Sequence, residues 1–157
     1  MAQEIERKFL IQDTSIVDSL AGERLTQGYL SHDKNATVRV RIAGTTGWLT
    51  IKGKTVGATR SEFEYPVPEE DARQMLDELC NAGVIDKTRY RLPQGTLCWE
   101  IDVFHGENDG LIVAEIELPS EDTPFDRPAW LGEEVTGDPR YYNSALSSTP
   151  FNQWADD

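Results

Sequence analysis

Near its N-terminus the chain reads Glu4-Ile5-Glu6-Arg7-Lys8-Phe9-Leu10. The side chains of a β-strand point alternately to the two faces of its sheet, so Glu4, Glu6 and Lys8 share one face. Ile5 lies between them and points to the other face. The alternation therefore predicts a strand over residues 3–11 that carries one charged face.

The same alternation recurs along the first 119 residues. Turn signals such as Asp33-Lys34-Asn35 and Pro93-Gln94-Gly95 separate the segments. The predicted strands are 3–11, 25–31, 36–43, 47–54, 60–67, 86–93, 96–104 and 111–119. The charged residues that share a face within a strand are Glu4, Glu6 and Lys8; Arg39 and Arg41; Lys52 and Lys54; Arg60, Glu62 and Glu64; Lys87, Arg89 and Arg91; Glu100 and Asp102; and Glu115 and Glu117.

These charges are sorted by sign, with basic strands at 39–41, 52–54 and 87–91 and acidic strands at 62–64, 100–102 and 115–117. An open antiparallel sheet with one solvated face would explain each strand taken alone. About eight antiparallel strands, however, favour closure, because a barrel leaves no exposed edge. We therefore predict an α+β domain, mainly antiparallel β, that closes into a barrel with its charged face inward.

A charged interior limits what such a barrel holds. Burying one ion in a dry interior costs several kcal/mol, against a total stability of roughly 5–15 kcal/mol. More than a dozen charges therefore require an interior that is wet, mutually paired or occupied by ions. A polyphosphate held by Lys and Arg, with divalent metal ions on the carboxylates, fits such a two-signed tunnel.

The composition excludes several other classes of protein. A formal net charge of −13 argues against general nucleic-acid binding, so a site for a polyanion must be a local concentration of basic residues. No apolar run approaches the roughly 20 residues of a membrane span, and the N-terminus lacks the pattern of a signal peptide. We expect a cytoplasmic protein without membrane contact. Cys80 and Cys98 fit no disulfide framework or metal spacing and are expected to be reduced thiols.

Helices are expected at three places. Pro68 and the acidic residues 69–71 open a helix that ends before Gly83, and Asp138-Pro139 is typical of a second helix start. A short helical turn is expected near 14–20. We expect a single domain over residues 1–150, followed by a flexible tail over 151–157.

Residues 4–8 also match the Glu-x-Glu-x-Lys signature of the CYTH superfamily, whose members are called triphosphate tunnel metalloenzymes. Further segments resemble the family in order: Gln27-Gly28-Tyr29-Leu30, Val38-Arg39-Val40-Arg41, Leu49-Thr50-Ile51-Lys52, Arg60-x-Glu62-x-Glu64, Lys87-Thr88-Arg89-Tyr90, Glu100-Ile101-Asp102, Glu115-Ile116-Glu117 and Gly132-Glu133-Glu134-Val135-Thr136. The resemblance spans about residues 3–146 and is closest to the short, single-domain bacterial members.

The resemblance implies a closed eight-stranded antiparallel barrel with helices packed outside. It implies metal-dependent hydrolysis of inorganic triphosphate (tripolyphosphate), or of a nucleoside or thiamine triphosphate, with Mg²⁺ or Mn²⁺ and two ions expected. The metal ligands or their helpers by family position are Glu4, Glu6, Glu62, Glu64, Asp102, Glu115 and Glu117. The residues expected to bind substrate phosphate are Lys8, Tyr29, Arg39, Arg41, Lys52, Lys87 and Arg89. Glu6 and Lys8 are the expected catalytic residues.

Some roles stay open at this level. Lys8 either helps to activate the attacking water or stays charged and binds phosphate. Tyr29 either contacts the substrate or packs as an aromatic side chain. Lys54, Arg60 and Arg91 lie nearer strand ends, where exposure to solvent is the alternative to a role in the tunnel. His32 and His105, beside turns, are expected to be solvated, and Glu134 is expected to support a loop.

Two other functions and one assembly are also compatible with a charged barrel. A class IV-type adenylate cyclase would need a purine pocket, for which no local motif is present. A non-catalytic binder of polyphosphate or of a phosphorylated ligand would not need two intact pairs of glutamates, so hydrolysis is favoured. The apolar outer face of the strands exceeds what two short helices cover, which predicts a homodimer.

Overall fold

The computed structural model describes residues 3–33, 35–80 and 83–154. Its strands are β1 (Gln3–Ile11), β2 (Gly22–Ser31), β3 (Ala36–Ala43), β4 (Thr46–Gly53), β5 (Thr59–Val67), β6 (Val84–Gln94), β7 (Leu97–Phe104), β8 (Ile112–Glu117) and β9 (Leu131–Glu134). Its helices are α1 (Glu69–Glu78) and α2 (Asn143–Ser148), with 3-10 turns η1 (Thr14–Ser19), η2 (Gly106–Asn108), η3 (Pro139–Tyr141) and η4 (Phe151–Gln153).

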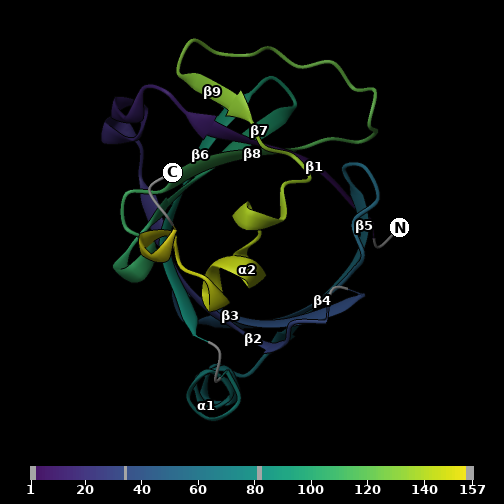
Figure 1. Ribbon diagram of the computed structural model, residues 1–157, viewed down its shortest axis with the longest axis vertical. Helices are drawn as coiled ribbons and strands as arrows, with labels where there is room; N and C mark the ends of the chain where they lie inside the picture. The colour runs from purple at the N-terminus through teal and green to yellow at the C-terminus, as the bar shows by residue number, and fades with distance from the viewer. Residues whose placement is uncertain (1–2, 34, 81–82, 155–157) are drawn as a thin grey trace.

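The first eight strands form a closed antiparallel barrel (Figure 1). Their order is β5-β4-β3-β2-β6-β7-β8-β1, and pairing of β1 with β5 closes the ring. All eight predicted strands are present, and the predicted closure is confirmed. The short strand β9 was not predicted. It extends the sheet along the end of β1, where Phe9 lies opposite Glu134 and Ile11 opposite Leu131.

Helix α1 packs on the outside of the barrel, against β2, β3 and β4. Its buried residue Ala72 joins Val40, Ile42 and Cys80 in one apolar cluster. The close approach requires a glycine on β2, because a Cβ atom at Gly28 would lie 2.7 Å from the Cβ atom of Cys80. The expectation of a helix packed outside is thus met by α1.

The C-terminal segment is arranged differently from the expectation of helices outside the barrel. Asp138 caps the 3-10 turn Pro139–Tyr141, and helix α2 follows only after Tyr142. Figure 1 shows α2 within the ring of strands. Of the expected tail, Phe151 and Trp154 pack against the apolar cluster around Tyr141 and Leu146, and residues 155–157 lie outside the described part of the chain. None of the described helices is long and apolar enough to cross a bilayer.

The main apolar cluster lies on the outer face of β1, β7 and β8. Phe9, Trp99, Ile101 and Ile116 are fully buried there. The covering side chains come from η1 and from the segment 118–130, which supplies Phe125 and Trp130 in edge-to-face contact with Trp99. Irregular segments thus cover part of the outer face that sequence analysis judged too large for two short helices.

Candidate active site

The inner faces of β1 and β8 meet in register inside the barrel. Glu6 lies opposite Glu117, and Lys8 lies opposite Glu115. The Nζ atom of Lys8 is 3.5 Å from Oε1 of Glu115 and donates to the carbonyl oxygen of Tyr141 at 3.1 Å. Burial alone would raise the pKa of Glu115, but nearby cations, Lys8 first among them, hold this pKa at about 2. Glu115 is therefore an ionised carboxylate beside a charged lysine.

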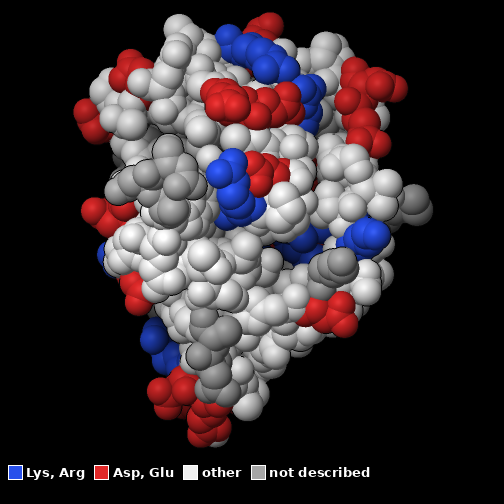
Figure 2. Space-filling view, in the orientation of Figure 1, with Lys and Arg blue, Asp and Glu red and all other residues white. Residues whose placement is uncertain are grey.

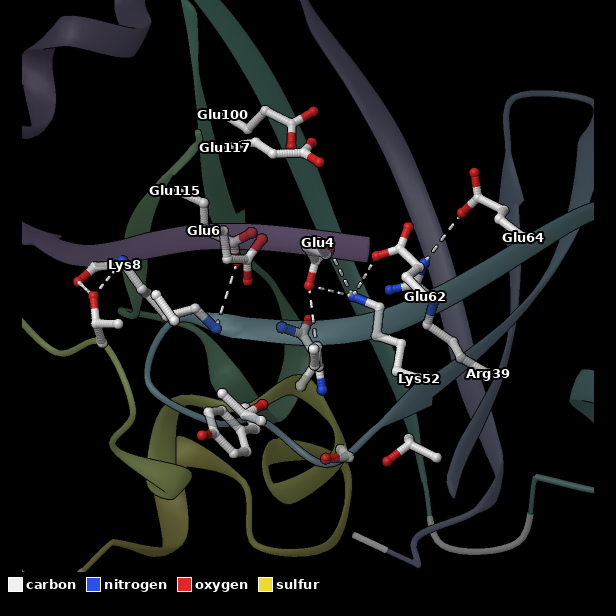
Figure 3. A pocket seen from close by; sticks show the side chains of 18 of the residues that line it. Glu4, Glu6, Lys8, Arg39, Lys52, Glu62, Glu64, Glu100, Glu115 and Glu117 are labelled. Carbon is white, nitrogen blue, oxygen red and sulfur yellow. Dashed lines mark hydrogen bonds and ion pairs between the residues drawn. The ribbon is translucent and has the colours of Figure 1, made fainter. Parts of the chain in front are cut away.

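Glu4 and Glu6 share one face of β1 but have opposite electrostatic surroundings (Figure 3). Glu4 accepts hydrogen bonds from Nζ of Lys52 and Nε of Arg60, both at 3.3 Å. These cations outweigh burial and bring the pKa of Glu4 below its ordinary value. Burial, together with the charges of Glu115 and Glu4, raises the pKa of Glu6 well above its ordinary value. An additional cation near Glu6 would therefore stabilise its ionised form.

Two buried polar atoms in the lumen have no hydrogen-bond partner among the described residues: Nε of Arg39 and Oε2 of Glu62. Burial, followed by the hydrogen bond with Glu4, raises the pKa of Glu62 to about 7. Arg39 uses Nη2 for Thr50, at 3.2 Å. Oε2 of Glu62 nevertheless lies 3.5 Å from Nζ of Lys52, so of these two atoms Nε of Arg39 is the one left without a partner among the described residues. Leaving a buried polar group unsatisfied costs about 1–3 kcal/mol, so this donor indicates a place for a ligand.

Below these groups lies a buried ionic triad of Lys87, Arg89 and Asp102. Nζ of Lys87 donates to Oδ2 of Asp102 at 2.8 Å, and Nε and Nη2 of Arg89 donate to the two carboxylate oxygens at 2.8 and 2.9 Å. Arg89 and Lys87 together outweigh burial and lower the pKa of Asp102. Asp102 is fully buried and does not line the cavity, whereas Lys87 and Arg89 do.

Tyr29 packs as an aromatic side chain and also reaches the cavity, and its contact with substrate stays a prediction. It is buried, packs beside the tilted ring of His32 with ring centroids 5.5 Å apart, and also lines the cavity. Its hydroxyl accepts a hydrogen bond from Nε2 of Gln27 at 3.3 Å, and Oε1 of Gln27 accepts from Nε of Arg41 at 2.8 Å. Tyr29 thus takes part in a polar network at the wall of the lumen.

The lumen holds a cavity of about 260 Å³. Every residue that sequence analysis placed in the site, except Asp102, lines it: Glu4, Glu6, Lys8, Tyr29, Arg39, Arg41, Lys52, Glu62, Glu64, Lys87, Arg89, Glu115 and Glu117. Eight Lys and Arg side chains and seven Glu side chains take part, so eight of the chain's fifteen basic residues gather here. Figure 2 shows Lys and Arg atoms inside a hollow to the right of the centre. Because the net charge is negative, a site for a polyanion was predicted to need a local concentration of basic residues. The cavity contains such a concentration.

The residues near strand ends differ from one another. Arg60 lines the cavity and is only 20% exposed, whereas Arg91 lines it at 51% exposure. Lys54 follows β4 and is exposed outside the cavity. Exposed His32 approaches Ser147 Oγ at 2.9 Å, and half-buried His105 approaches Thr88 Oγ1 at 2.7 Å. Both therefore take part in hydrogen bonds rather than being only solvated.

Some lining residues were not singled out from the sequence. Thr37 has the same parity as Arg39 and Arg41, so alternation was a usable signal for it. Tyr142, Asn143 and Ser144 enter the lumen from the C-terminal segment. No local pattern could have placed them there, because only tertiary packing brings this segment inside the ring.

The carboxylates fit a divalent cation, although the described side chains do not converge as a finished cage of three or more ligands. The oxygen donors suit a hard ion such as Mg²⁺, which is commonly bound by one or two carboxylates together with substrate phosphates. Burial and the charges of Glu115 and Glu4 raise the pKa of Glu6, and Oε2 of Glu62 has an ion-pair contact with Lys52 at 3.5 Å but no hydrogen bond among the described residues. Both features are those expected of a carboxylate group that receives a cation with its substrate.

The sorted cations and carboxylates line the lumen of a closed antiparallel barrel and do not lie on its loops. This arrangement is that of a tunnel-type barrel for charged ligands. The CYTH domain model matches residues 2–145, and the chain belongs to this family.

Two relatives and one crystal structure are similar over nearly their whole length. The inorganic triphosphatase of Acetivibrio thermocellus is 44% identical over 154 residues, covering 98% of this chain and 99% of the relative. The inorganic triphosphatase of Nitrosomonas europaea is 40% identical over 149 residues, covering 92% and 96%. The crystal structure of an inorganic triphosphatase matches with a TM-score of 0.67 and 33% identity, covering 92% of this chain and 97% of that one.

Proposed function

We propose that this chain hydrolyses inorganic triphosphate, or a compound that carries a triphosphate, inside its barrel. The observation that carries the proposal is the convergence of eight cationic and seven acidic side chains on one cavity. The activity of the two relatives at 44% and 40% identity supports the same reaction. Phosphoryl transfer relies mainly on positioning and charge stabilisation, which such a lumen is suited to supply.

The cationic residues would hold the phosphate oxygens. Arg39 offers its unpartnered Nε atom, and arginine is suited to two-pronged contacts with phosphate. Arg41, Lys52, Lys87 and Arg89 surround the same cavity. Because these side chains are already fixed by Gln27, Glu4 and Asp102, little reorganisation would be needed when charge develops on the oxygens.

The carboxylates would hold Mg²⁺ or Mn²⁺, with two ions as the expected number. We assign Glu4, Glu6, Glu115 and Glu117 as the ligands, with Glu62 and Glu64 beside them. Asp102 acts as a helper at a distance, because both of its oxygens already accept from Lys87 and Arg89. A bound divalent cation would withdraw negative charge from the phosphate oxygens and so ease attack at phosphorus. A triphosphate alone would make the nearly balanced lumen strongly negative, which also favours divalent cations.

Lys8 acts as a charged phosphate ligand in this proposal. Although burial lowers its pKa, Glu115 and Glu6 reverse the effect, so the pKa of Lys8 lies above its ordinary value. Its contacts with Glu115 and with the carbonyl oxygen of Tyr141 hold the ammonium group at the cavity wall. A lysine held in this way would stabilise negative charge on the phosphate rather than remove a proton from water.

The test is phosphate release from tripolyphosphate, ATP and thiamine triphosphate with Mg²⁺, Mn²⁺ or EDTA. We expect release that depends on the metal and is reduced about a hundredfold or more in Glu6→Gln. Glu78→Gln, which changes an exposed carboxylate at the end of α1, is the matched control and should retain wild-type activity. No release from any of the three compounds would contradict the proposal, and formation of cyclic AMP from ATP would replace it.

A further inference from the structure

The cavity has a blind corner, which is visible in the exposure of side chains along β6. Arg91 is 51% exposed, Arg89 is 9% exposed, Lys87 is 1% exposed and Ile85 is fully buried. These four residues alternate along one strand and so share its inner face. The inner face therefore passes from solvent, through the cations, to a dry interior.

An apolar cluster seals this corner. Ile85 packs there with Phe104 and Val113 from the neighbouring strands and with Leu146 from α2, each at most 1% exposed. The last polar groups before the seal are Lys87 on β6 and Asp102 on β7, beside Asn143 at the start of α2. A chain of phosphates that enters the lumen cannot continue beyond this level.

Asn143 has a fixed orientation at the corner. Its Oδ1 atom accepts hydrogen bonds from Nζ of Lys87 at 2.9 Å and from Nε2 of Gln27 at 3.2 Å. Two donors on one atom identify it as the oxygen, so the amide nitrogen is the other branch. This Nδ2 atom has no hydrogen-bond partner among the described residues, and Asn143 lines the cavity. The amide therefore offers a free donor to the lumen.

We infer that Asn143 is a specificity-determining residue that binds the free terminal phosphoryl group of the substrate. The inference rests on the proposed function. A terminal phosphoryl group presents three unshared oxygens, whereas an internal one presents two and must continue on both sides. The corner offers donors from Lys8, Lys87 and Asn143 and is sealed behind them. The site thus selects triphosphates with at least one unesterified end, and any organic group lies toward the open part of the lumen.

Equilibrium binding in EDTA, measured by calorimetry, tests this assignment without metal or turnover. The probes are tripolyphosphate, which has two free ends, and diadenosine triphosphate, which has none. The key variant is Asn143→Asp, which keeps an oxygen for Lys87 and Gln27 but replaces the amide donor by an anionic acceptor. Ser148→Asp adds the same charge at an exposed position of α2 and is the matched control.

We expect Asn143→Asp to weaken the binding of tripolyphosphate about tenfold or more, the scale of a hydrogen bond to a charged group, and to change the binding of diadenosine triphosphate little. Asn143→Ala, which removes the donor without adding charge, should show the same selectivity between the probes. Equal weakening for both probes, unchanged binding of tripolyphosphate, or no binding of it by the wild type would overturn the inference. Because nothing is hydrolysed, failure of the phosphate-release test leaves this test intact.

Discussion

Lys8 is the residue whose role depends most on its neighbours. Its ammonium group is held between Glu115 and the carbonyl oxygen of Tyr141, so its charge is retained at the cavity wall. Replacing Lys8 by Met should lower kcat for tripolyphosphate about a hundredfold or more, the usual effect of removing one donor that stabilises transition-state charge. Lys54→Met removes an exposed lysine that directly follows β4 and should leave kcat unchanged. A Lys8→Met enzyme with wild-type kcat would show that Lys8 is not needed.

Asp102 shows what alternation alone could predict about single residues. Its parity with Glu100 placed it correctly on the inner face of β7. Alternation does not show, however, how far along the barrel axis a residue lies. Asp102 lies at the sealed end, where Lys87 and Arg89 donate to both of its carboxylate oxygens. The face of a residue was therefore predictable from sequence, whereas its partners across strands depended on register.

At the scale of elements, the ion pair between Arg7 and Glu134 fastens β9 to β1. Nε and Nη2 of Arg7 donate to the two oxygens of Glu134 at 2.8 and 2.7 Å. Mainly because of these hydrogen bonds, the pKa of Glu134 falls from 4.5 to about 2. A carboxyl group with a lowered pKa stabilises the fold above its ordinary pKa, and this contribution disappears as the pH falls through about 2.

We therefore expect Glu134→Gln to lower the free energy of unfolding by about 1–2 kcal/mol near neutral pH, since the pair is partly exposed. The difference from the wild type should shrink steadily as the pH falls from about 4.5 toward 2. Urea unfolding at a series of pH values measures it, with Glu133→Gln as an exposed neighbouring control. A difference that stays constant with pH would mean that the charge of Glu134 does not carry the effect.

Some strands and helices are specified by their local sequence, and others by their tertiary contacts. The eight barrel strands were predictable because each alternates over several residues and ends at a turn signal. Strand β9 has only four residues, Leu131-Gly132-Glu133-Glu134, and owes its strand conformation to pairing with β1. Helix α2 was expected from Asp138, but its position inside the ring depends on the fit of Leu146 to the apolar end of the barrel.

At the scale of the whole molecule, charge is separated between the inside and the outside. The cavity is lined by nearly equal numbers of positive and negative side chains, although the chain carries a net charge of −13. The excess of acidic residues therefore lies outside the lumen. An anionic substrate would be repelled at a distance and attracted only inside, which favours entry of the phosphates together with divalent cations.

The outer face of β5 carries two large apolar side chains that are exposed. Phe63 is 44% exposed and Tyr65 is 55% exposed, and they pair with Ile51 and Leu49 on the neighbouring strand. We propose that this patch is the centre of a homodimer interface, because contiguous exposed apolar patches mark association surfaces. The barrel is closed, so the two copies would meet through faces and not through strand edges.

Light scattering at micromolar protein concentration tests this proposal, with a dimer mass expected for the wild type. Phe63→Glu should give a monomer, since a charge buried at the centre of an interface is unpaired and costly. Leu79→Glu adds the same charge at an exposed apolar position after α1 and should remain dimeric. Phosphate release should be retained in the Phe63→Glu monomer, because Phe63 is not among the residues that line the cavity. A monomer mass for the wild type, or a Phe63→Glu dimer, would exclude this interface and leave the patch as ordinary surface.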